Sequence, residues 1–159
     1  MKKSVSIIVL TLNERLGVEK ILPKIKKKWC EQLLVIDGGS TDGTIEWCKK
    51  NGYQIIIQKK KGIRNAYTEA LPLIEGDLIL TFSPDGNCEV NDIPKLISEI
   101  KKKNLDLVIA SRYYNGEKSD DDDIITKFGN WLFTNTVNFL FKGNLTDVMV
   151  IYRIFKKGL

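Results

Sequence analysis

The sequence predicts an α/β fold with a mostly parallel sheet flanked by helices. Two observations support this prediction. Short apolar runs of strand length alternate along the chain with segments whose apolar residues recur at helical spacing. Clusters of Gly, Asp, Asn and Ser follow several of the apolar runs, as turns do. Strands joined by helical crossovers pair in parallel, and right-handed crossovers build a layered, doubly wound sheet.

The first half of the chain supplies three strand–helix units. The predicted strands cover residues 6–10, 33–36 and 54–57. The helices that follow them are expected over residues 18–29, 44–51 and 64–74. The turn-rich segment 37–43 precedes the second helix, and Ser40 or Thr41 is expected to cap it.

The second half continues this alternation and then changes character. Strands are predicted over 77–82 and 105–111, with a helix between them marked by Ile93, Leu96, Ile97 and Ile100. Residues 113–123 end in four aspartates, which predicts a mobile, solvated loop. A helix over 124–142 and a strand over 148–155 complete the chain.

The predicted helix over 124–142 has aromatic residues around much of its circumference. Such breadth predicts burial on more than one side. The helix would then pack against the sheet or against a second protomer, so a homodimer is left open. The alternative is a position in a membrane interface, which aromatic-rich amphipathic helices favour.

Length and composition fit one globular domain over residues 1–159. The 25 Lys and Arg residues exceed the 20 Asp and Glu residues, which gives a formal net charge of +5. The three cysteines are widely spaced and odd in number, which fits neither a disulfide framework nor a zinc site and favours a reducing, cytoplasmic compartment. No stretch reaches the roughly 18 consecutive apolar residues of a transmembrane helix, so any membrane contact is expected to be peripheral, at the cytoplasmic face.

The lack of histidine excludes Ser-His-Asp and Cys-His nucleophile schemes and removes the usual transition-metal ligand. Any chemistry must therefore use carboxylates, amides, lysine, arginine and the backbone. The lysine runs at 26–28, 59–61 and 101–103 are interpreted as solvated helix ends, because no aromatic-interleaved basic surface accompanies them. We expect no nucleic-acid partner; a basic scaffold is the minor alternative, and its binding would fall steeply with salt.

Polar residues follow most of the predicted strands, and in a parallel α/β sheet ligands bind beyond the carboxyl ends of the strands. The loops around Asn13–Glu14, Asp37, Lys61–Gly62, Asp85–Asn87 and Arg112 are therefore expected to converge. The Asp85-Gly86-Asn87 triplet could grip one hard cation, Mg²⁺ or Mn²⁺, with Glu89 reaching it directly or through water. The same triplet is also an ordinary turn sequence, and both interpretations stay open.

Two further loops suggest a nucleotide ligand. Asp37 ends a strand, where its carboxylate could accept hydrogen bonds from a ribose or a base edge. The Gly-x-Gly-x-x-Gly fingerprint is absent from the loop that follows, which disfavours a simple dinucleotide-binding dehydrogenase. The segment Lys61–Arg64 precedes a helix whose N-terminus could face phosphate oxygens, with lysine and arginine supplying the opposite charge.

Taken together, four sequence blocks resemble glycosyltransferase family 2, whose members have the GT-A fold. The blocks are Val9–Glu14, Val35–Thr44, Gly62–Ala66 and Asp85–Asn87, in the family's order and spacing. The resemblance covers about residues 4–156 and is strongest to the dolichol-phosphate-mannose-synthase-like branch. It implies a Rossmann-like GT-A domain, a nucleotide-diphosphate-sugar donor such as a UDP- or GDP-sugar, a divalent metal and an inverting transfer.

The resemblance also implies roles for individual residues. The expected nucleotide-sugar-binding residues are Thr11, Leu12, Asn13, Glu14, Asp37, Lys61, Gly62, Arg64, Asp85 and Gly86. The expected metal ligands are Asp85, Asn87 and Glu89, where Asp85 and Asn87 take the places of the family's Asp-x-Asp. Arg112 looks like a phosphate-contacting arginine, and Thr146–Asp147 with Tyr152–Arg153 resembles a block near the acceptor. Asp85, Arg112 and Asp147 are the expected catalytic residues.

The acceptor decides whether a base is needed. A polyprenyl phosphate is already ionised at neutral pH and needs none, whereas a hydroxyl acceptor needs one, for which Asp147 is the candidate. Asn87 replaces a charged ligand of the family, and Val150 and Ile151 stand where Ser-Gly is usual. These departures, with the end of the chain at Leu159, leave open a compact member, a fragment, or a non-catalytic nucleotide-sugar-binding module.

Overall fold

The computed structural model describes residues 3–113 and 124–159. The chain forms two compact units, Met1–Val108 with Tyr152–Leu159, and Ile109–Ile151, and each is described by itself. The single domain expected over 1–159 stays a prediction. The loop expected over 113–123 lies, apart from Tyr113, outside the described residues.

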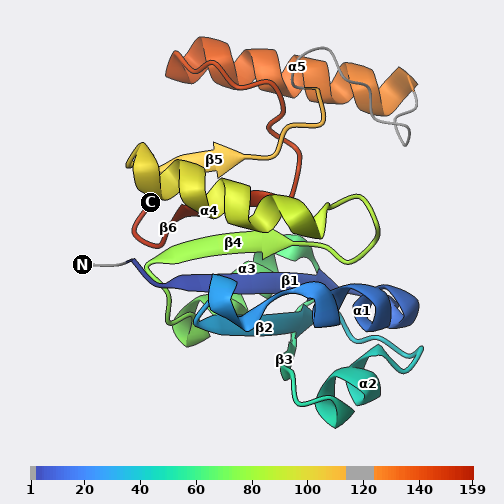
Figure 1. Cartoon of the computed structure of the whole chain (residues 1–159). Coiled ribbons are helices and arrows are strands. Elements are labelled where there is room, and N and C mark those ends of the chain that lie inside the picture. Colours follow the sequence, from blue (N-terminus) through green and yellow to red (C-terminus); the bar gives the residue numbers. More distant parts are fainter. Residues whose placement is uncertain (1–2, 114–123) are drawn as a thin grey trace. The chain divides into compact units, whose positions relative to one another are not determined.

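The first unit is built around a six-stranded sheet with the order β3-β2-β1-β4-β6-β5 (Figure 1). The strands are β1 (Val5–Thr11), β2 (Gln32–Asp37), β3 (Gln54–Ile57), β4 (Leu78–Phe82), β5 (Leu107–Ile109) and β6 (Arg153–Lys156). β1 pairs in parallel with β2 and β4, and β2 pairs in parallel with β3, while β6 runs antiparallel to β4. The predicted mostly parallel α/β fold is confirmed. The last strand begins only at Arg153, five residues later than predicted.

Four helices belong to this unit: α1 (Arg15–Ile21), α2 (Thr44–Lys50), α3 (Ile63–Ala70) and α4 (Ile93–Lys102). Two of them are shorter than predicted. α1 and α3 each give way to a 3₁₀ turn, Leu22–Lys24 and Leu71–Leu73, and each turn contains a proline. Proline lacks the N–H that a continuing helix needs and crowds the preceding turn. The expectation of unbroken helices over 18–29 and 64–74 was therefore wrong.

Helices cover both faces of the sheet. Figure 1 shows α1 and α4 on the near face and α3 behind it. Ala66 and Ala70 of α3 join a buried cluster with Ile8, Leu34 and Ile36 of β1 and β2. Burial on both faces explains why the central strands are almost continuously apolar rather than alternating.

The order of the strands places a topological switch at β1. β2 and β3 follow on one side of β1, whereas the next strand, β4, pairs on its other side. In open α/β sheets the crevice beyond such a switch is the usual ligand site. The loops that leave β1 and β4 therefore lie where a ligand is expected.

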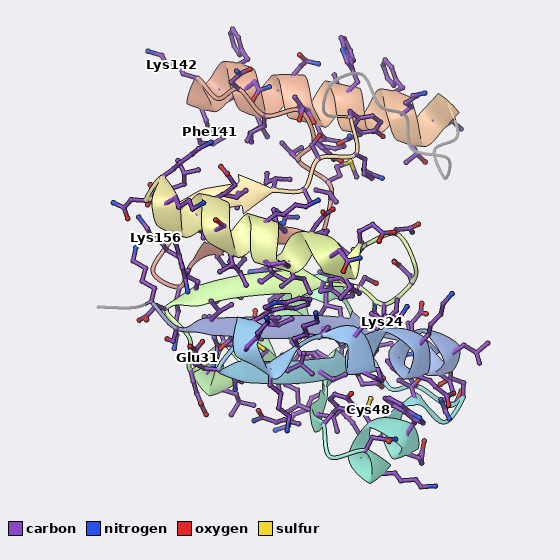
Figure 2. The ribbon with its side chains drawn as sticks, viewed as in Figure 1. Lys24, Glu31, Cys48, Phe141, Lys142 and Lys156 are labelled. Carbon is purple, nitrogen blue, oxygen red and sulfur yellow. The ribbon has the colours of Figure 1, made fainter. Side chains whose placement is uncertain are left out.

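The second unit carries one long helix, α5 (Ile124–Phe141). Buried polar side chains, Asn130 and Thr134, lie on this helix, whereas several aromatic ones are exposed, including Phe139 (85%) and Phe141 (77%, beside Lys142 in Figure 2). The expected packing of α5 against the sheet or a second protomer, and its alternative in a membrane interface, stay predictions. Within the described residues, we find no helix with the length and apolarity to cross a membrane.

Candidate functional site

The loops that leave β1 and β2 are locked together by reciprocal hydrogen bonds. The Asn13 backbone N–H donates to Ser40 Oγ over 2.8 Å, and the Thr41 backbone N–H donates to Asn13 Oδ1 over 2.9 Å. Asn13 adopts a left-handed backbone conformation (φ 56°), in which asparagine is one of the few tolerated side chains. The two loops therefore form one structural unit at the carboxyl edge of the sheet.

Asp42 extends this lock to the starts of α1 and α2. Its carboxylate accepts the backbone N–H of Arg15 over 2.9 Å and both the N–H and the hydroxyl of Thr44 over 3.0 and 2.5 Å. Burial would raise the pKa of Asp42, but these hydrogen bonds outweigh it and lower the pKa. The expected helix cap by Ser40 or Thr41 was wrong: α2 begins after Gly43 with no side-chain cap of its own.

Asp37 is buried at the end of β2 and anchors the loop that follows. Its Oδ1 accepts the backbone N–H groups of Gly39 and Ser40 over 2.8 and 2.7 Å. Its Oδ2 accepts the hydroxyls of Thr11 and Ser40 over 2.8 and 2.6 Å. A ribose or base contact by Asp37 stays a prediction, and it would require the carboxylate to exchange one of these four partners.

The loop after β4 presents Asp85 at the same edge. Asp85 accepts hydrogen bonds from the Ser83 hydroxyl (2.9 Å) and from the Asn87 backbone N–H (3.0 Å), which form a compact turn. Gly86 lies within this turn at φ 97°, where a side chain would be strained. At the far end of the loop, the Tyr152 hydroxyl donates to the Glu89 carbonyl over 2.9 Å.

Close packing brings this loop against the start of α1. A Cβ added at Gly17 would fall far inside van der Waals contact with the Pro84 carbonyl oxygen, so only glycine fits there without a shift. A cavity of about 490 Å³ lies between the two elements, and its charged lining residues are Glu14, Lys20, Lys24, Asp85 and Glu89.

Glu14, in the loop after β1, is affected by the charge of Asp85 in the loop after β4. Partial burial, together with the charges of Asp85 and Asp42, raises the pKa of Glu14 above its ordinary value of 4.5. Carboxylates that repel one another in this way are stabilised by a bound cation or by protonation. Glu14 and Asp85 line the same cavity, so the loops after β1 and β4 meet, as the sequence predicted for these two loops.

The carboxylates that line this cavity are of the type that binds a hard cation. Asp85, Glu89 and Glu14 offer the oxygen ligands that Mg²⁺ and Mn²⁺ prefer, and all three line the cavity. Across residues 3–113 and 124–159, however, we find no three His, Cys, Asp or Glu side chains arranged to hold a metal together. Such an ion commonly takes one or two protein carboxylates and completes its shell with phosphates and water. The predicted Asp85–Asn87–Glu89 ligand set stays a prediction, and Asn87 is not among the residues that line the cavity.

The Lys61–Arg64 segment follows β3, at the same carboxyl edge, and it forms hydrogen bonds with the start of its own helix. Gly62 precedes α3 at φ 105°. Asn65 Nδ2 donates to the Lys61 carbonyl, and Glu69 accepts the backbone N–H groups of Lys59 and Lys60. Lys61, Gly62 and Arg64 are exposed, so their predicted contact with a diphosphate stays a prediction.

Arg112 and Asp147 meet in the second unit. Arg112 Nε donates to Asp147 Oδ2 over 2.8 Å and Nη2 donates to Oδ1 over 3.3 Å, which forms a two-point fork. Burial alone would raise the pKa of Asp147, but hydrogen bonds and charge from Arg112, with a hydrogen bond from Asn130, lower it instead. A carboxylate with a lowered pKa that is engaged by a guanidinium is a poor general base.

Sequence reasoning missed several of these residues. Asp42 and Ser40 were interpreted only as turn or cap residues, although they connect the β1 and β2 loops. Lys20 and Lys24 line the cavity. Their spacing of four residues predicts that they lie on one side of a helix, which was the available signal. Gly17 left no signal, because its importance arises from the approach of a segment 67 residues away in sequence.

Comparison with known proteins now decides the family. The profile described as Glycosyl transferase family 2 matches residues 6–159. The chain belongs to glycosyltransferase family 2. Among curated relatives, glycosyltransferase AglJ of Haloferax volcanii is 26% identical over 155 residues, which cover 97% of this chain and 50% of the relative. The dodecaprenyl-phosphate galacturonate synthase of Rhizobium johnstonii is 26% identical over 157 residues, covering 90% of this chain and 43% of that protein.

Solved structures confirm the GT-A-like fold. Glucosyl-3-phosphoglycerate synthase from Mycobacterium tuberculosis, in complex with Mn²⁺, UDP-glucose and phosphoglyceric acid, superposes with a TM-score of 0.80 at 17% identity. The match covers 99% of this chain and 58% of that chain. This family 2 chain thus spans about half the length of these three proteins.

Proposed function

We propose that this chain transfers a sugar from a nucleotide-diphosphate sugar to an acceptor. The observation that carries the proposal is the cavity at the topological switch, which is lined by Glu14 from the β1 loop and by Asp85 from the β4 loop. Burial and the charge of Asp85 raise the pKa of Glu14 there. Family membership supports the same conclusion, because the relatives include a hexosyltransferase, Agl6 of Haloferax volcanii, that is 26% identical over 160 residues.

In this proposal the β1 and β2 loops hold the nucleotide and the β4 loop holds the diphosphate end of the donor. Asp85 and Glu89, with Asn87 as a neutral partner, would hold Mg²⁺ or Mn²⁺, and the solved neighbour that binds UDP-glucose also contains Mn²⁺. Such an ion supplies charge neutralisation for the departing nucleotide diphosphate, which is worth several kcal/mol of barrier. Lys20 and Lys24 at the cavity, and Lys61 and Arg64 after β3, add positive charge that favours the phosphate oxygens.

The proposed acceptor is a polyprenyl phosphate, and the proposed transfer is inverting. An ionised phosphate oxygen attacks the anomeric carbon from the face opposite the leaving group and needs no base. The engagement of Asp147 by Arg112 supports this choice, because it makes the candidate base for a hydroxyl acceptor a poor one. The relative named dodecaprenyl-phosphate galacturonate synthase supports it independently, as does the resemblance to the dolichol-phosphate-mannose-synthase-like branch.

A peripheral contact with the membrane completes the proposal. A polyprenyl phosphate lies in a bilayer, so the enzyme must work at the bilayer surface. The exposed aromatic and aliphatic side chains of α5, which include Phe128, Phe139 and Phe141, would suit the interface region of lipid. Lys127 and Lys142 near the two ends of the helix would favour anionic headgroups.

Calorimetric titration of the full chain with UDP-glucose, and separately with GDP-mannose, in the presence of Mn²⁺ tests the donor site. Asp85→Ala should abolish metal-dependent binding of the donor that the wild type binds. Asp106→Ala is the matched control, because it removes an exposed carboxylate elsewhere on the same unit, one paired with Lys156. Equal donor affinity in the wild type and Asp85→Ala would refute the proposed site.

Nucleotide release in the presence of farnesyl phosphate, a short and soluble polyprenyl phosphate, tests turnover. Release that depends on the acceptor supports the transferase. Metal-dependent donor binding without any release supports instead the alternative of a non-catalytic nucleotide-sugar-binding module. Asn87, and Val150 and Ile151 in the acceptor block, are the sequence features that favour this alternative.

A further inference from the structure

We propose that Tyr152 is a positioning residue, whose hydroxyl holds the loop after β4 so that Asp85 and Glu89 can bind the diphosphate end of the donor. The inference rests on the proposed function, because it takes this loop as the part that binds the metal and the diphosphate. The sequence resemblance placed Tyr152 in a block near the acceptor, and the inference gives it a role at the donor instead. All the residues that carry it belong to the first unit.

Tyr152 lies beside the end of β4. β6 pairs antiparallel with β4, and the last pair of the register joins Thr81 to Arg153 (Figure 1). The next positions along the two segments are Phe82 and Tyr152, whose rings meet edge to face at a centroid distance of 5.3 Å and an angle of 89°. Both side chains are buried. The ring of Tyr152 is therefore fixed at the point where β4 ends and the loop begins.

The hydroxyl of Tyr152 reaches the other end of the same loop, residues 83–89. It donates to the Glu89 carbonyl oxygen over 2.9 Å. That oxygen also accepts the Asp92 backbone N–H over 3.0 Å, in the 3₁₀ turn that leads into α4. Tyr152 thus contacts the residue before the loop with its ring and the last residue of the loop with its hydroxyl, so it holds the loop at both ends.

The loop has a buried base and an exposed tip. Pro84 and Cys88 are buried, whereas residues 85–87 are exposed. A hydrogen bond joins the Ser83 backbone to the Cys88 side chain across the base. At the tip, the Ser83 hydroxyl and a backbone N–H of the loop itself donate to the Asp85 carboxylate. The placement of that carboxylate relative to the sheet therefore depends on how the base is held, and the bond from Tyr152 is one of the contacts that hold it.

Packing alone does not explain the hydroxyl of Tyr152. A phenylalanine ring would make the same edge-to-face contact with Phe82. A buried hydroxyl costs free energy unless it finds a partner, and here the partner is the backbone of the loop that carries Asp85 and Glu89. Neighbours that orient metal-binding groups by hydrogen bonds typically change metal affinity about 10- to 100-fold. The hydroxyl is therefore suited to fix the loop and not only to fill space.

Tyr152→Phe tests the inference, because it removes the hydroxyl and keeps the ring. We expect about 10-fold weaker binding of UDP-glucose in the presence of Mn²⁺ than in the wild type, measured by calorimetric titration. A loosened loop samples orientations in which Asp85 and Glu89 cannot hold the ion against the diphosphate. The same titration in EDTA should give equal results for the two proteins.

Tyr53→Phe is the matched control. It removes a hydroxyl from another tyrosine of the same unit, whose ring stacks on Trp47 at a centroid distance of 5.6 Å. Its binding of UDP-glucose should equal that of the wild type both with Mn²⁺ and in EDTA. An equal loss in Tyr53→Phe and Tyr152→Phe would overturn the inference, because the effect would then not depend on the loop.

Hydrogen exchange in the metal-free protein locates the effect. The backbone amides of Asn87 and Asp92, which form hydrogen bonds within the loop and at its end, should exchange faster in Tyr152→Phe, whereas β1 and β2 should be unchanged. A purely structural role would accelerate exchange throughout the sheet and weaken donor binding equally with and without metal, which would overturn the inference. A Tyr152→Phe chain that does not fold would overturn it too, because the hydroxyl would then support the whole fold.

Failure of the inference can be told apart from failure of the proposed function. Equal Mn²⁺-dependent affinity for UDP-glucose in the wild type and Tyr152→Phe would overturn the inference and leave the donor site in place. If the wild type binds neither UDP-glucose nor GDP-mannose, the proposed function fails, and the inference is judged by titration with Mn²⁺ alone. Weaker Mn²⁺ binding in Tyr152→Phe would then support it, and absent or equal Mn²⁺ binding would overturn it.

Discussion

The loops around Asp37 and segment 145–149 are both held in place by polar side chains, but in different surroundings. Around Asp37, polar contacts sit directly on a sheet whose core is apolar and buried on both faces. In the second unit, Asn130, Thr134 and Asn138 of α5 form hydrogen bonds with segment 145–149, while aromatic residues of the same helix are exposed. In both regions, hydrogen bonds from polar side chains hold the backbone of the loop in place.

This difference also determines how much stability is lost when each region is disturbed. A buried hydrogen-bonded group that loses its partner costs more than an exposed one, because the orphaned group cannot turn to water. The contacts of Asp37 are buried, whereas those of Asn138 are only partly buried. We therefore expect the largest effects at the sheet edge and smaller ones along α5.

Asp37→Ala should have the largest effect, a loss of about 3–5 kcal/mol in the free energy of unfolding. The substitution leaves two backbone N–H groups and the hydroxyls of Thr11 and Ser40 without their acceptor. Chemical denaturation monitored by tryptophan fluorescence measures it. Asp106→Ala, which removes an exposed carboxylate, should cost less than about 1 kcal/mol. Similar losses for the two variants would show that the Asp37 network is not a structural anchor.

Gly17→Ala should come next, with a loss of about 2 kcal/mol and weaker donor binding. Alanine favours helix over glycine by about 1 kcal/mol, but here its Cβ would collide with the Pro84 carbonyl and displace the loop that carries Asp85. Gly129→Ala in α5 is the matched control, because no atom lies within 4 Å of the added Cβ. It should be neutral or slightly stabilising. A Gly17→Ala variant as stable as wild type, with unchanged donor affinity, would mean that the loop does not need this close approach.

Much of the fold could be predicted from the sequence because local signals determine it. The central strands are uninterrupted apolar runs, and their alternation with helical periodicity gives the sheet and its crossovers. The errors have local causes as well. Pro23 and Pro72 convert the ends of two predicted helices into 3₁₀ turns, because proline interrupts a helix even where the apolar residues keep their helical spacing.

The candidate site was predictable only at the level of which loops meet. Parallel strands bring the ends of β1, β2 and β4 to one edge, so the approach of Glu14 to Asp85 follows from topology. The topology does not predict which groups each carboxylate binds. Asp37 binds its own loop and Asp147 binds Arg112, because a buried carboxylate takes whichever donors the fold brings within reach. Residue type and spacing along the chain do not specify those donors.

The last and smallest prediction concerns α5, in which the polar residues Asn130 and Thr134 are buried while several aromatic residues are exposed. Asn138→Ala should lower the free energy of unfolding by about 1–2 kcal/mol, because it removes both hydrogen bonds to the Leu145 backbone. Phe139→Ala, one residue further along, should change it by less than about 0.5 kcal/mol, because that ring is 85% exposed. In an ordinary amphipathic helix the order would be the opposite, since the aromatic side chain would be the buried one. Thermal denaturation of the two variants side by side decides between the arrangements: a larger loss for Phe139→Ala would show that the aromatic side chains, and not polar residues such as Asn138, hold α5 in place.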